Sequence, residues 1–156
     1  MTTFEYFEQS LTSARALGDT IPKRSLQAIV ENAYGIHFHN NCWKVIGITE
    51  ACLRAFAEND FKSGVVKAQR AHLFQRRETY MNVIYSDMTA NEALQYIADR
   101  DISLMALRSE NKDDNSLINF APIDPNDGYF PSASIGYTFR NKIEGQFLRQ
   151  LAEQYL

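Results

Sequence analysis

Apolar residues recur at helical spacing in the first part of the chain. A capping-box pattern, Thr2 with Glu5, opens the first predicted helix, and Gly18 ends it. Pro22 opens a second helix, where its missing N–H group is tolerated, and Gly35 ends that helix. The apolar positions of the two helices are Phe4, Phe7, Leu11 and Ala14, then Leu26, Ile29, Val30 and Ala33. We therefore expect these two segments to form a helical hairpin.

The middle of the chain predicts two more helices. Residues 35–39 alternate between apolar and polar, which is typical of a very short strand or an extended loop. Asn40 or Asn41 then caps a third helix, whose inward residues are Val45, Ile48, Cys52 and Phe56. The longest uninterrupted helical pattern follows, from Val65 to Tyr85, without Gly or Pro. We expect the rest of the chain to pack around this fourth helix.

The C-terminal part of the chain changes from a helical to an alternating pattern. Thr89 with Glu92 forms a second capping box, which opens a short helix. After it, residues 102–107, 117–121 and 134–139 favour β-strands. Asn141 with Glu144 caps the last predicted helix, whose shared face carries Ile143, Phe147, Leu148, Leu151 and Tyr155.

These elements predict one α+β domain that covers residues 1–156. We expect its N-terminal two-thirds to be mainly helical, followed by a small, mostly antiparallel sheet and a C-terminal helix. The length of 156 residues and the 45% hydrophobic content are sufficient for a buried core.

The charge balance limits the possible partners. A formal net charge of −3 argues against a protein that coats nucleic acid non-specifically or lies on anionic membrane. No apolar run is long enough for a membrane span. Cys42 and Cys52 lie in one predicted helix and cannot pair within it, so reduced thiols and a cytoplasmic location are expected.

Two arginines interrupt the apolar face of the predicted Val65–Tyr85 helix. Arg70 and Arg77 are two turns apart, about 10 Å along the axis, and point the same way. The planar guanidinium group suits bidentate binding of phosphate or carboxylate. With Arg76 beside them, they predict a site for an anionic ligand.

A structural role is the alternative for these two arginines. A buried guanidinium group is costly unless it is paired, so both side chains could bridge carboxylates of their own chain. Their aliphatic stems would then cover apolar surface. The acids that would fit this role are Glu50, Glu92 and Asp99.

Cys42 is a candidate nucleophile. It lies near the start of a predicted helix, where the thiolate is favoured, and His39 precedes it by three residues. Asn41-Cys42-Trp43 resembles the nucleophile region of papain-like cysteine peptidases. That resemblance implies a catalytic histidine far downstream, whereas the last histidine here is His72, in a predicted helix.

Two further patterns bear on metal chemistry. His37, His39 and Cys42 provide three potential ligands but no fourth, and we expect surface histidines rather than a metal site. Glu110 and Lys112 follow a predicted strand, as the Glu-x-Lys pattern of metal-dependent nucleases does, but a solvated turn is the simpler interpretation. We expect no metal and no cofactor.

We therefore expect a small cytoplasmic binding module that engages a nucleic-acid backbone or a phosphorylated ligand through Arg70, Arg77 and Arg76. A protein–protein regulator, such as an inhibitor, chaperone or immunity-type factor, is the alternative. Its contact would be the loop 124–131, with Tyr129 and Phe130 exposed. An enzyme that uses Cys42 or Glu110 is a further alternative.

Overall fold

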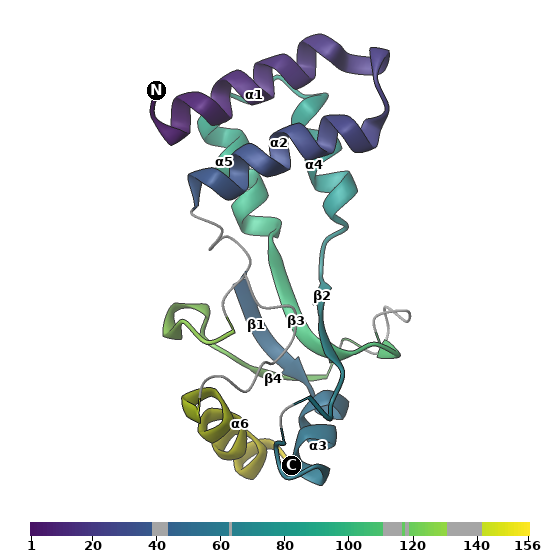
Figure 1. Cartoon of the computed structure of the whole chain (residues 1–156), viewed down its shortest axis with the longest axis vertical. Coiled ribbons are helices and arrows are strands. Elements are labelled where there is room, and N and C mark those ends of the chain that lie inside the picture. The colour runs from purple at the N-terminus through teal and green to yellow at the C-terminus, as the bar shows by residue number, and fades with distance from the viewer. Residues whose placement is uncertain (39–43, 63, 111–116, 118, 131–141) are drawn as a thin grey trace. The chain divides into compact units, whose positions relative to one another are not determined.

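The computed structural model describes residues 1–38, 44–62, 64–110, 117, 119–130 and 142–156 (Figure 1). These residues form two compact units. Unit 1 comprises the described residues of Met1–Trp43 and Leu73–Ile102, and unit 2 those of Lys44–His72 and Ser103–Leu156. Each unit is therefore built from two separate stretches of the chain.

The predicted α+β class is confirmed. The described residues contain six α-helices and one four-stranded mixed sheet, and the last element is a helix. No described helix combines the length and the apolar composition that a bilayer span requires.

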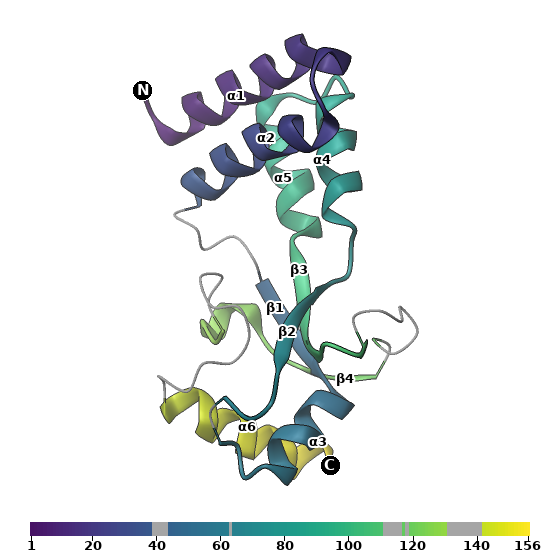
Figure 2. The same ribbon diagram turned by 45° about the vertical axis from the view of Figure 1, so that its right-hand side comes forward.

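Unit 1 is helical. It contains α1 (Thr3–Leu17), α2 (Lys23–His37), α4 (Arg76–Ile84) and α5 (Ala90–Arg100), with a short 3₁₀ turn, η1 (Gly18–Thr20), between the first two. In Figures 1 and 2, α1 lies beside α2 and α4 lies beside α5. The core of this unit includes Phe7, Leu11, Leu26, Val30, Tyr34, Tyr80, Val83, Leu94 and Ile97.

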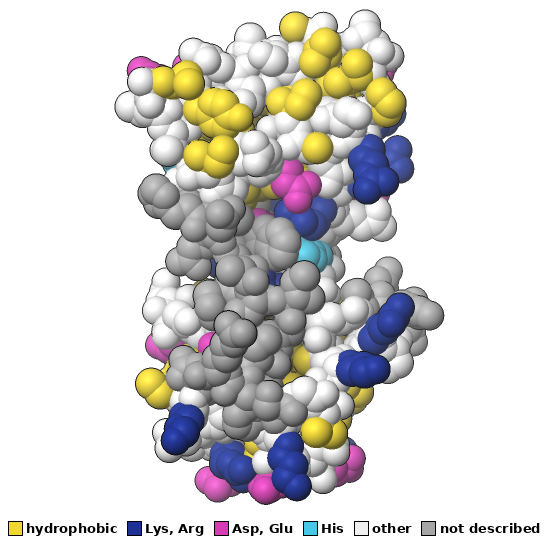
Figure 3. Space-filling view, viewed as in Figure 1, with side chains coloured by type: hydrophobic (Ala, Val, Ile, Leu, Met, Phe, Trp, Pro, Cys, Tyr) yellow, Lys and Arg dark blue, Asp and Glu magenta, His cyan; other side chains and the backbone are white. Residues whose placement is uncertain are grey.

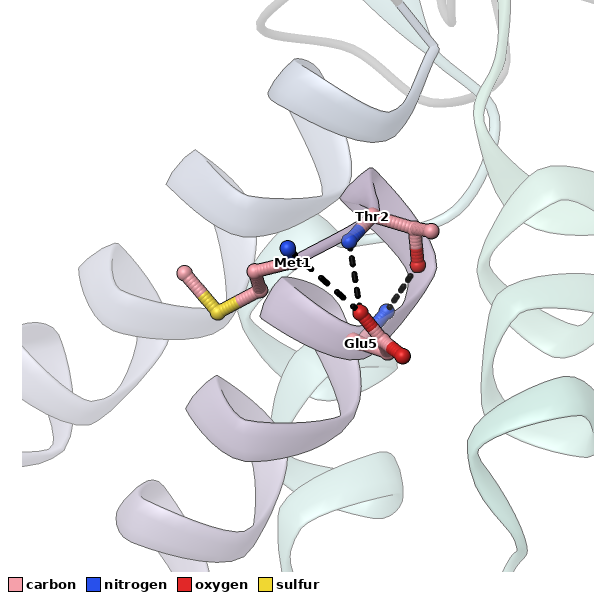
Figure 4. Close-up of polar contacts among 3 residues, drawn as sticks. All are labelled: Met1, Thr2 and Glu5. Atoms are coloured by element: carbon pink, nitrogen blue, oxygen red, sulfur yellow. Dashed lines mark hydrogen bonds and ion pairs between the residues drawn. The ribbon is translucent and has the colours of Figure 1, made fainter.

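The first helix begins as its capping box predicts. The Glu5 backbone N–H donates to the Thr2 hydroxyl over 3.1 Å, and the Thr2 backbone N–H donates to the Glu5 carboxylate over 2.6 Å (Figure 4). The N-terminal ammonium of Met1 also lies 3.9 Å from the same carboxylate. These contacts satisfy donors that the first turn of a helix leaves without an internal partner.

Unit 2 combines the sheet with two helices. Its elements are β1 (Lys44–Thr49), α3 (Glu50–Glu58), β2 (Ala68–His72), β3 (Ile102–Leu107, whose first residue belongs to unit 1), β4 (Phe120–Pro122), the 3₁₀ turn η4 (Pro125–Asp127) and α6 (Lys142–Tyr155). The strand order is β2-β3-β1-β4. The two outer pairs are antiparallel, with Arg70 opposite Met105 and Ile48 opposite Ala121. Figure 1 shows β1 and β3 running in the same direction.

The core of unit 2 lies between the sheet and the two helices. Residues of β1, β3 and β4 meet apolar residues of α3 and α6 in one buried cluster. Its buried members include Val45, Ile48, Leu53, Phe56, Met105, Phe130, Leu148 and Leu151. The middle residues of β3 are buried without interruption, so this strand does not show the alternation of a half-exposed strand.

The predicted Val65–Tyr85 helix is wrong. Residues Ala68–His72 form β2, and the helix α4 begins only at Arg76. No local breaker separates these segments, but β3 offers a hydrogen-bonding partner over the whole length of β2. Tertiary pairing therefore overrides the local helical pattern.

Other boundaries also differ from the sequence prediction. The third helix begins at Glu50, because Lys44–Thr49 form the strand β1, and α2 continues through Gly35 to His37. The strand predicted at 117–121 is observed as Phe120–Pro122. The capping residues Asn40, Asn41 and Asn141 and the strand at 134–139 lie outside the described residues.

Candidate functional site

Arg70 and Arg77 do not share a helix. Arg70 lies on β2 in unit 2, whereas Arg77 lies in the first turn of α4 in unit 1. The inference that both side chains project from one face of a single helix is therefore wrong, and each must be considered in its own unit.

Arg70 contacts the backbone of its own unit. Its Nη2 donates to the carbonyl oxygen of Phe130 over 3.1 Å, and the Phe130 N–H donates to the Glu144 carboxylate over 3.0 Å. Phe130 has a φ of 56°, a left-handed conformation that is uncommon for a bulky residue. Arg70 and Glu144 thus hold both sides of an unusual backbone position, which gives Arg70 a structural role.

The three acids considered as partners for the arginines are engaged elsewhere. Glu50 pairs with Arg54 over 2.8 Å, Glu92 accepts from Thr89, and Asp99 accepts from Gln95.

Arg77 lines an open groove on unit 1, which we call the basic groove. Most of its other lining residues come from one face of α2, where positions three and four apart are neighbours. Its lining residues are Pro22, Lys23, Arg24, Gln27, Ala28, Glu31 and Arg77. Figure 3 shows Lys and Arg side chains gathered near the first turns of α2. The groove thus joins two segments that are far apart in the sequence.

Contacts at both ends of the basic groove fix the direction of its two helices. Glu31 pairs with Arg76, at the start of α4, over 2.7 Å. The Lys23 ammonium lies 5.8 Å from the ring centroid of Tyr85, at the end of α4. The helices α2 and α4 therefore run antiparallel, and Lys23 and Glu31 are about 12 Å apart along α2.

The groove carries an excess of positive charge. Its one carboxylate, Glu31, is neutralised by Arg76 and also accepts from Gln27 over 3.1 Å. Arg24 and Arg77 are exposed and make no ion pair with any described residue. Their charges, with that of Lys23, face solvent around the groove.

Sequence reasoning missed Lys23 and Arg24. Their signal was two consecutive cations in the first turn of a helix that has no side-chain cap, because Pro22 occupies the cap position. Cations are disfavoured at that end of the helix dipole, so their presence there is informative.

Tyr85 lies at the same end of the groove as Lys23. The residue is 50% exposed, and its hydroxyl donates to the Asp19 carboxylate over 2.7 Å. This hydrogen bond is the main reason that the pKa of Tyr85 is raised. The ring is thus held in place while much of its surface faces solvent.

The predicted partner contact at Tyr129 and Phe130 is only partly exposed. Phe130 is 2% exposed and belongs to the core of unit 2, so the expectation of an exposed Phe130 ring is wrong. Tyr129 is half-buried and stacks on Phe147 with ring centroids 4.2 Å apart. A partner contact through Tyr129 stays a prediction.

Glu110 is half-buried and belongs to a polar cluster at the start of α3. Its carboxylate accepts from the Thr49 hydroxyl over 2.7 Å and from the Leu107 N–H over 2.8 Å. The Thr49 hydroxyl in turn accepts from the Cys52 N–H over 3.3 Å and caps α3. Burial, followed by the Glu110 charge, raises the pKa of the Cys52 thiol. This geometry ties the end of β3 to the start of α3.

Several predicted site residues lie outside the described part of the chain, namely His39, Cys42 and Lys112. His37 is described, and its Nδ1 lies 3.2 Å from the Thr3 hydroxyl. Among the described residues, no three His, Cys, Asp or Glu side chains come together as metal ligands.

Comparisons with protein-family models, with curated proteins and with solved structures found no match to this chain.

Proposed function

We propose that this protein is a binding module for a phosphate-bearing partner, either a nucleic-acid backbone or a phosphorylated ligand, and that it binds through the basic groove. The observation that carries the proposal is the convergence of Lys23, Arg24 and Arg77 around a groove whose one acid is already neutralised.

The chemistry of the groove suits phosphate. Two guanidinium groups can each donate two hydrogen bonds to phosphate oxygens, and the Lys23 ammonium adds a point charge. The positive end of the α2 dipole lies at the same place and favours an anion. Because the net charge of the chain is −3, we expect binding to depend on this local surface rather than on overall attraction.

We assign phosphate binding to Arg77 and no longer to Arg70. Arg77 lines the groove, Arg76 holds Glu31, and Arg70 supports the backbone of unit 2. A cytoplasmic setting is part of the proposal, and the free, buried thiol of Cys52 supports it.

Calorimetric titration with inorganic tripolyphosphate at low ionic strength tests this proposal. We expect the unmodified protein to bind, and we expect Arg77→Ala and the double variant Lys23→Ala/Arg24→Ala each to weaken binding at least about 10-fold. The matched control is Arg108→Ala/Lys142→Ala, which removes the same charge as the double variant from exposed positions of unit 2. Absence of binding, or equal loss in the control, would contradict the proposal.

The variant Arg70→Ala distinguishes the role of Arg70 from that of Arg77. We expect it to lower the free energy of unfolding by about 1–3 kcal/mol, because the buried Phe130 carbonyl loses a charged donor, and to leave tripolyphosphate binding unchanged. Arg77→Ala should instead weaken tripolyphosphate binding and leave the free energy of unfolding unchanged. Urea titration and calorimetry measure the two effects, and loss of binding in Arg70→Ala would count against the assignment.

A protein–protein regulator is the second candidate, because unit 2 presents two aromatic side chains in one depression. Phe120 and Tyr155 are 38% and 43% exposed, and both line a depression with Leu53 and Asn119. Exposed aromatic residues often anchor interfaces. A stoichiometric protein partner that survives nuclease treatment and is lost in Phe120→Ala/Tyr155→Ala would favour this candidate. Catalysis through Cys42 or Glu110 stays a weaker alternative.

A further inference from the structure

We infer that the ligand of the basic groove is single-stranded nucleic acid, with its phosphates on Lys23, Arg24 and Arg77 and one base stacked on Tyr85. This inference rests on the proposed function and names the ligand class. It requires an aromatic surface beside the phosphate site, and Tyr85 provides one.

Tyr85 is an ordered and accessible stacking surface. Half of the residue is exposed, although an aromatic ring gains free energy from burial. The hydrogen bond to Asp19 limits rotation of the ring, so little side-chain freedom is left to lose when a base binds. An exposed ring held in this way is suited to contact with a flat ligand.

The position of Lys23 links the ring to the groove. The Lys23 ammonium lies 5.8 Å from the Tyr85 centroid and also lines the groove. A nucleotide presents a phosphate and a base together, so its phosphate can contact Lys23 while its base covers the ring. Cationic grooves with adjacent aromatic side chains are the usual arrangement of single-strand binding sites.

The length of the groove favours a chain over a small phosphate. Lys23 and Arg24 lie at the start of α2, whereas Arg77 belongs to the first turn of α4, which Glu31 and Arg76 place at the other end. Since Lys23 and Glu31 are about 12 Å apart along α2, cations at the two ends of the groove can contact different phosphates of one strand. A duplex would hide the faces of its bases, so Tyr85 would contribute nothing to duplex binding.

The number of cations predicts a modest salt dependence. Three phosphate contacts on a single strand give a slope of about −2 for the logarithm of the association constant against the logarithm of the salt concentration. Removal of Arg77 alone should reduce the magnitude of this slope by about 0.7.

The test is fluorescence anisotropy with a labelled oligothymidylate of about 10 nucleotides. We expect Tyr85→Leu to weaken oligonucleotide binding about 10-fold and to leave tripolyphosphate binding unchanged, since the groove cations remain. Tyr85→Phe keeps the stacking surface and should retain most of the affinity. Tyr155→Leu is the control, because it removes an exposed tyrosine that belongs to unit 2 and not to unit 1, and it should leave oligonucleotide binding unchanged.

Other outcomes distinguish a failure of this inference from a failure of the proposed function. If tripolyphosphate binds at the groove but the oligonucleotide does not, this inference fails and the proposed function stands. If neither binds, both fail. The inference is also overturned if a duplex of the same length binds as tightly as the single strand, or if Tyr85→Leu has no effect on oligonucleotide binding.

Discussion

Cys52 is a buried thiol whose ionisation the fold opposes. Burial raises its pKa, and the nearby Glu110 carboxylate raises it further. The side chain is 0% exposed and belongs to the core of unit 2. Since the thiolate is the reactive form, Cys52 serves as a small apolar residue rather than as a nucleophile.

We expect Cys52 to be protected from thiol reagents. In a Cys42→Ser variant, Cys52 is the remaining cysteine, and its labelling at about pH 8 should be at least about 100-fold slower in the folded protein than in denaturant. Equal rates in the two states would show that the side chain is accessible. Because the folded pKa is raised, the contribution of this thiol to stability is complete below about pH 8.5 and decreases as the pH rises above that value.

Thr89, which caps α5, is a second residue whose contribution to stability can be predicted. Its hydroxyl accepts from the Glu92 N–H, and its N–H and hydroxyl donate to the Glu92 carboxylate. Thr89→Ala should lower the free energy of unfolding by about 1 kcal/mol through loss of the hydroxyl cap. The control Thr12→Ala, at an exposed position of α1, should change it by less than about 0.5 kcal/mol.

The same cap has a pH dependence. Hydrogen bonds from Thr89 lower the pKa of Glu92. Its carboxylate therefore stabilises the folded state above the unfolded pKa of about 4.3, and this contribution is lost as the pH falls through the folded value. The stability difference between the unmodified protein and Thr89→Ala should shrink in acid denaturation curves below about pH 4. A constant difference would contradict this assignment.

At the scale of elements, β1 shows how closely neighbouring strands approach. A Cβ added at Gly47 would clash with the Phe120 side chain and would lie 2.9 Å from the Ala121 carbonyl oxygen and 3.0 Å from the Leu104 side chain. The Ala121 contact is with backbone, which cannot move aside without disturbing the pairing of β1 with β4. Glycine is therefore required here for close packing.

Gly47→Ala should lower the free energy of unfolding by about 1–3 kcal/mol, measured by urea denaturation. The double variant Gly47→Ala/Phe120→Ala removes the shortest contact and should recover part of the loss relative to Phe120→Ala alone. Complete recovery would mean that the Ala121 carbonyl imposes no restriction, and no loss in Gly47→Ala would contradict the observed approach of the strands.

The elements also show which patterns are reliable. Capping boxes at Thr2 and Thr89 correctly located two helix starts, because a cap and its donors lie within one turn. The segments that became β1 and β2 were assigned to helices, since apolar residues such as Val45 and Ile48 fit a helical stripe as well as a strand.

At the scale of the whole molecule, the described residues bury two separate hydrophobic clusters, one in each unit. Ile97 belongs to the first and Ile48 to the second, and both are almost fully buried. Residues that share no packing partners should contribute to stability independently.

Ile97→Val and Ile48→Val should each lower the free energy of unfolding by about 0.5–1.5 kcal/mol. In the double variant the two losses should add within about 0.5 kcal/mol, as measured by denaturant titration. A larger coupling energy would show that the two cores depend on each other energetically.

The sequence by itself determined the helices α1, α2 and α5 of unit 1, the strand β3, the final helix and the α+β class. Each of these follows from local information, since caps, glycine and proline positions and apolar periodicity act over a few residues. It also indicated Arg77 as a candidate site residue, although the reason given was a long helix that the structure does not contain.

Only the tertiary structure decided which segments pair and which charges meet. Ala68–His72 became a strand because β3 satisfies its backbone, and no residue within that segment encodes this partner. Lys23, Arg24 and Arg77 surround one groove because α2 and α4 pack antiparallel. Arg70 donates to the Phe130 carbonyl because tertiary packing brings β2 close to a residue 60 positions later in the chain. The physical cause is that long-range contacts depend on the burial of whole surfaces, which local patterns do not specify.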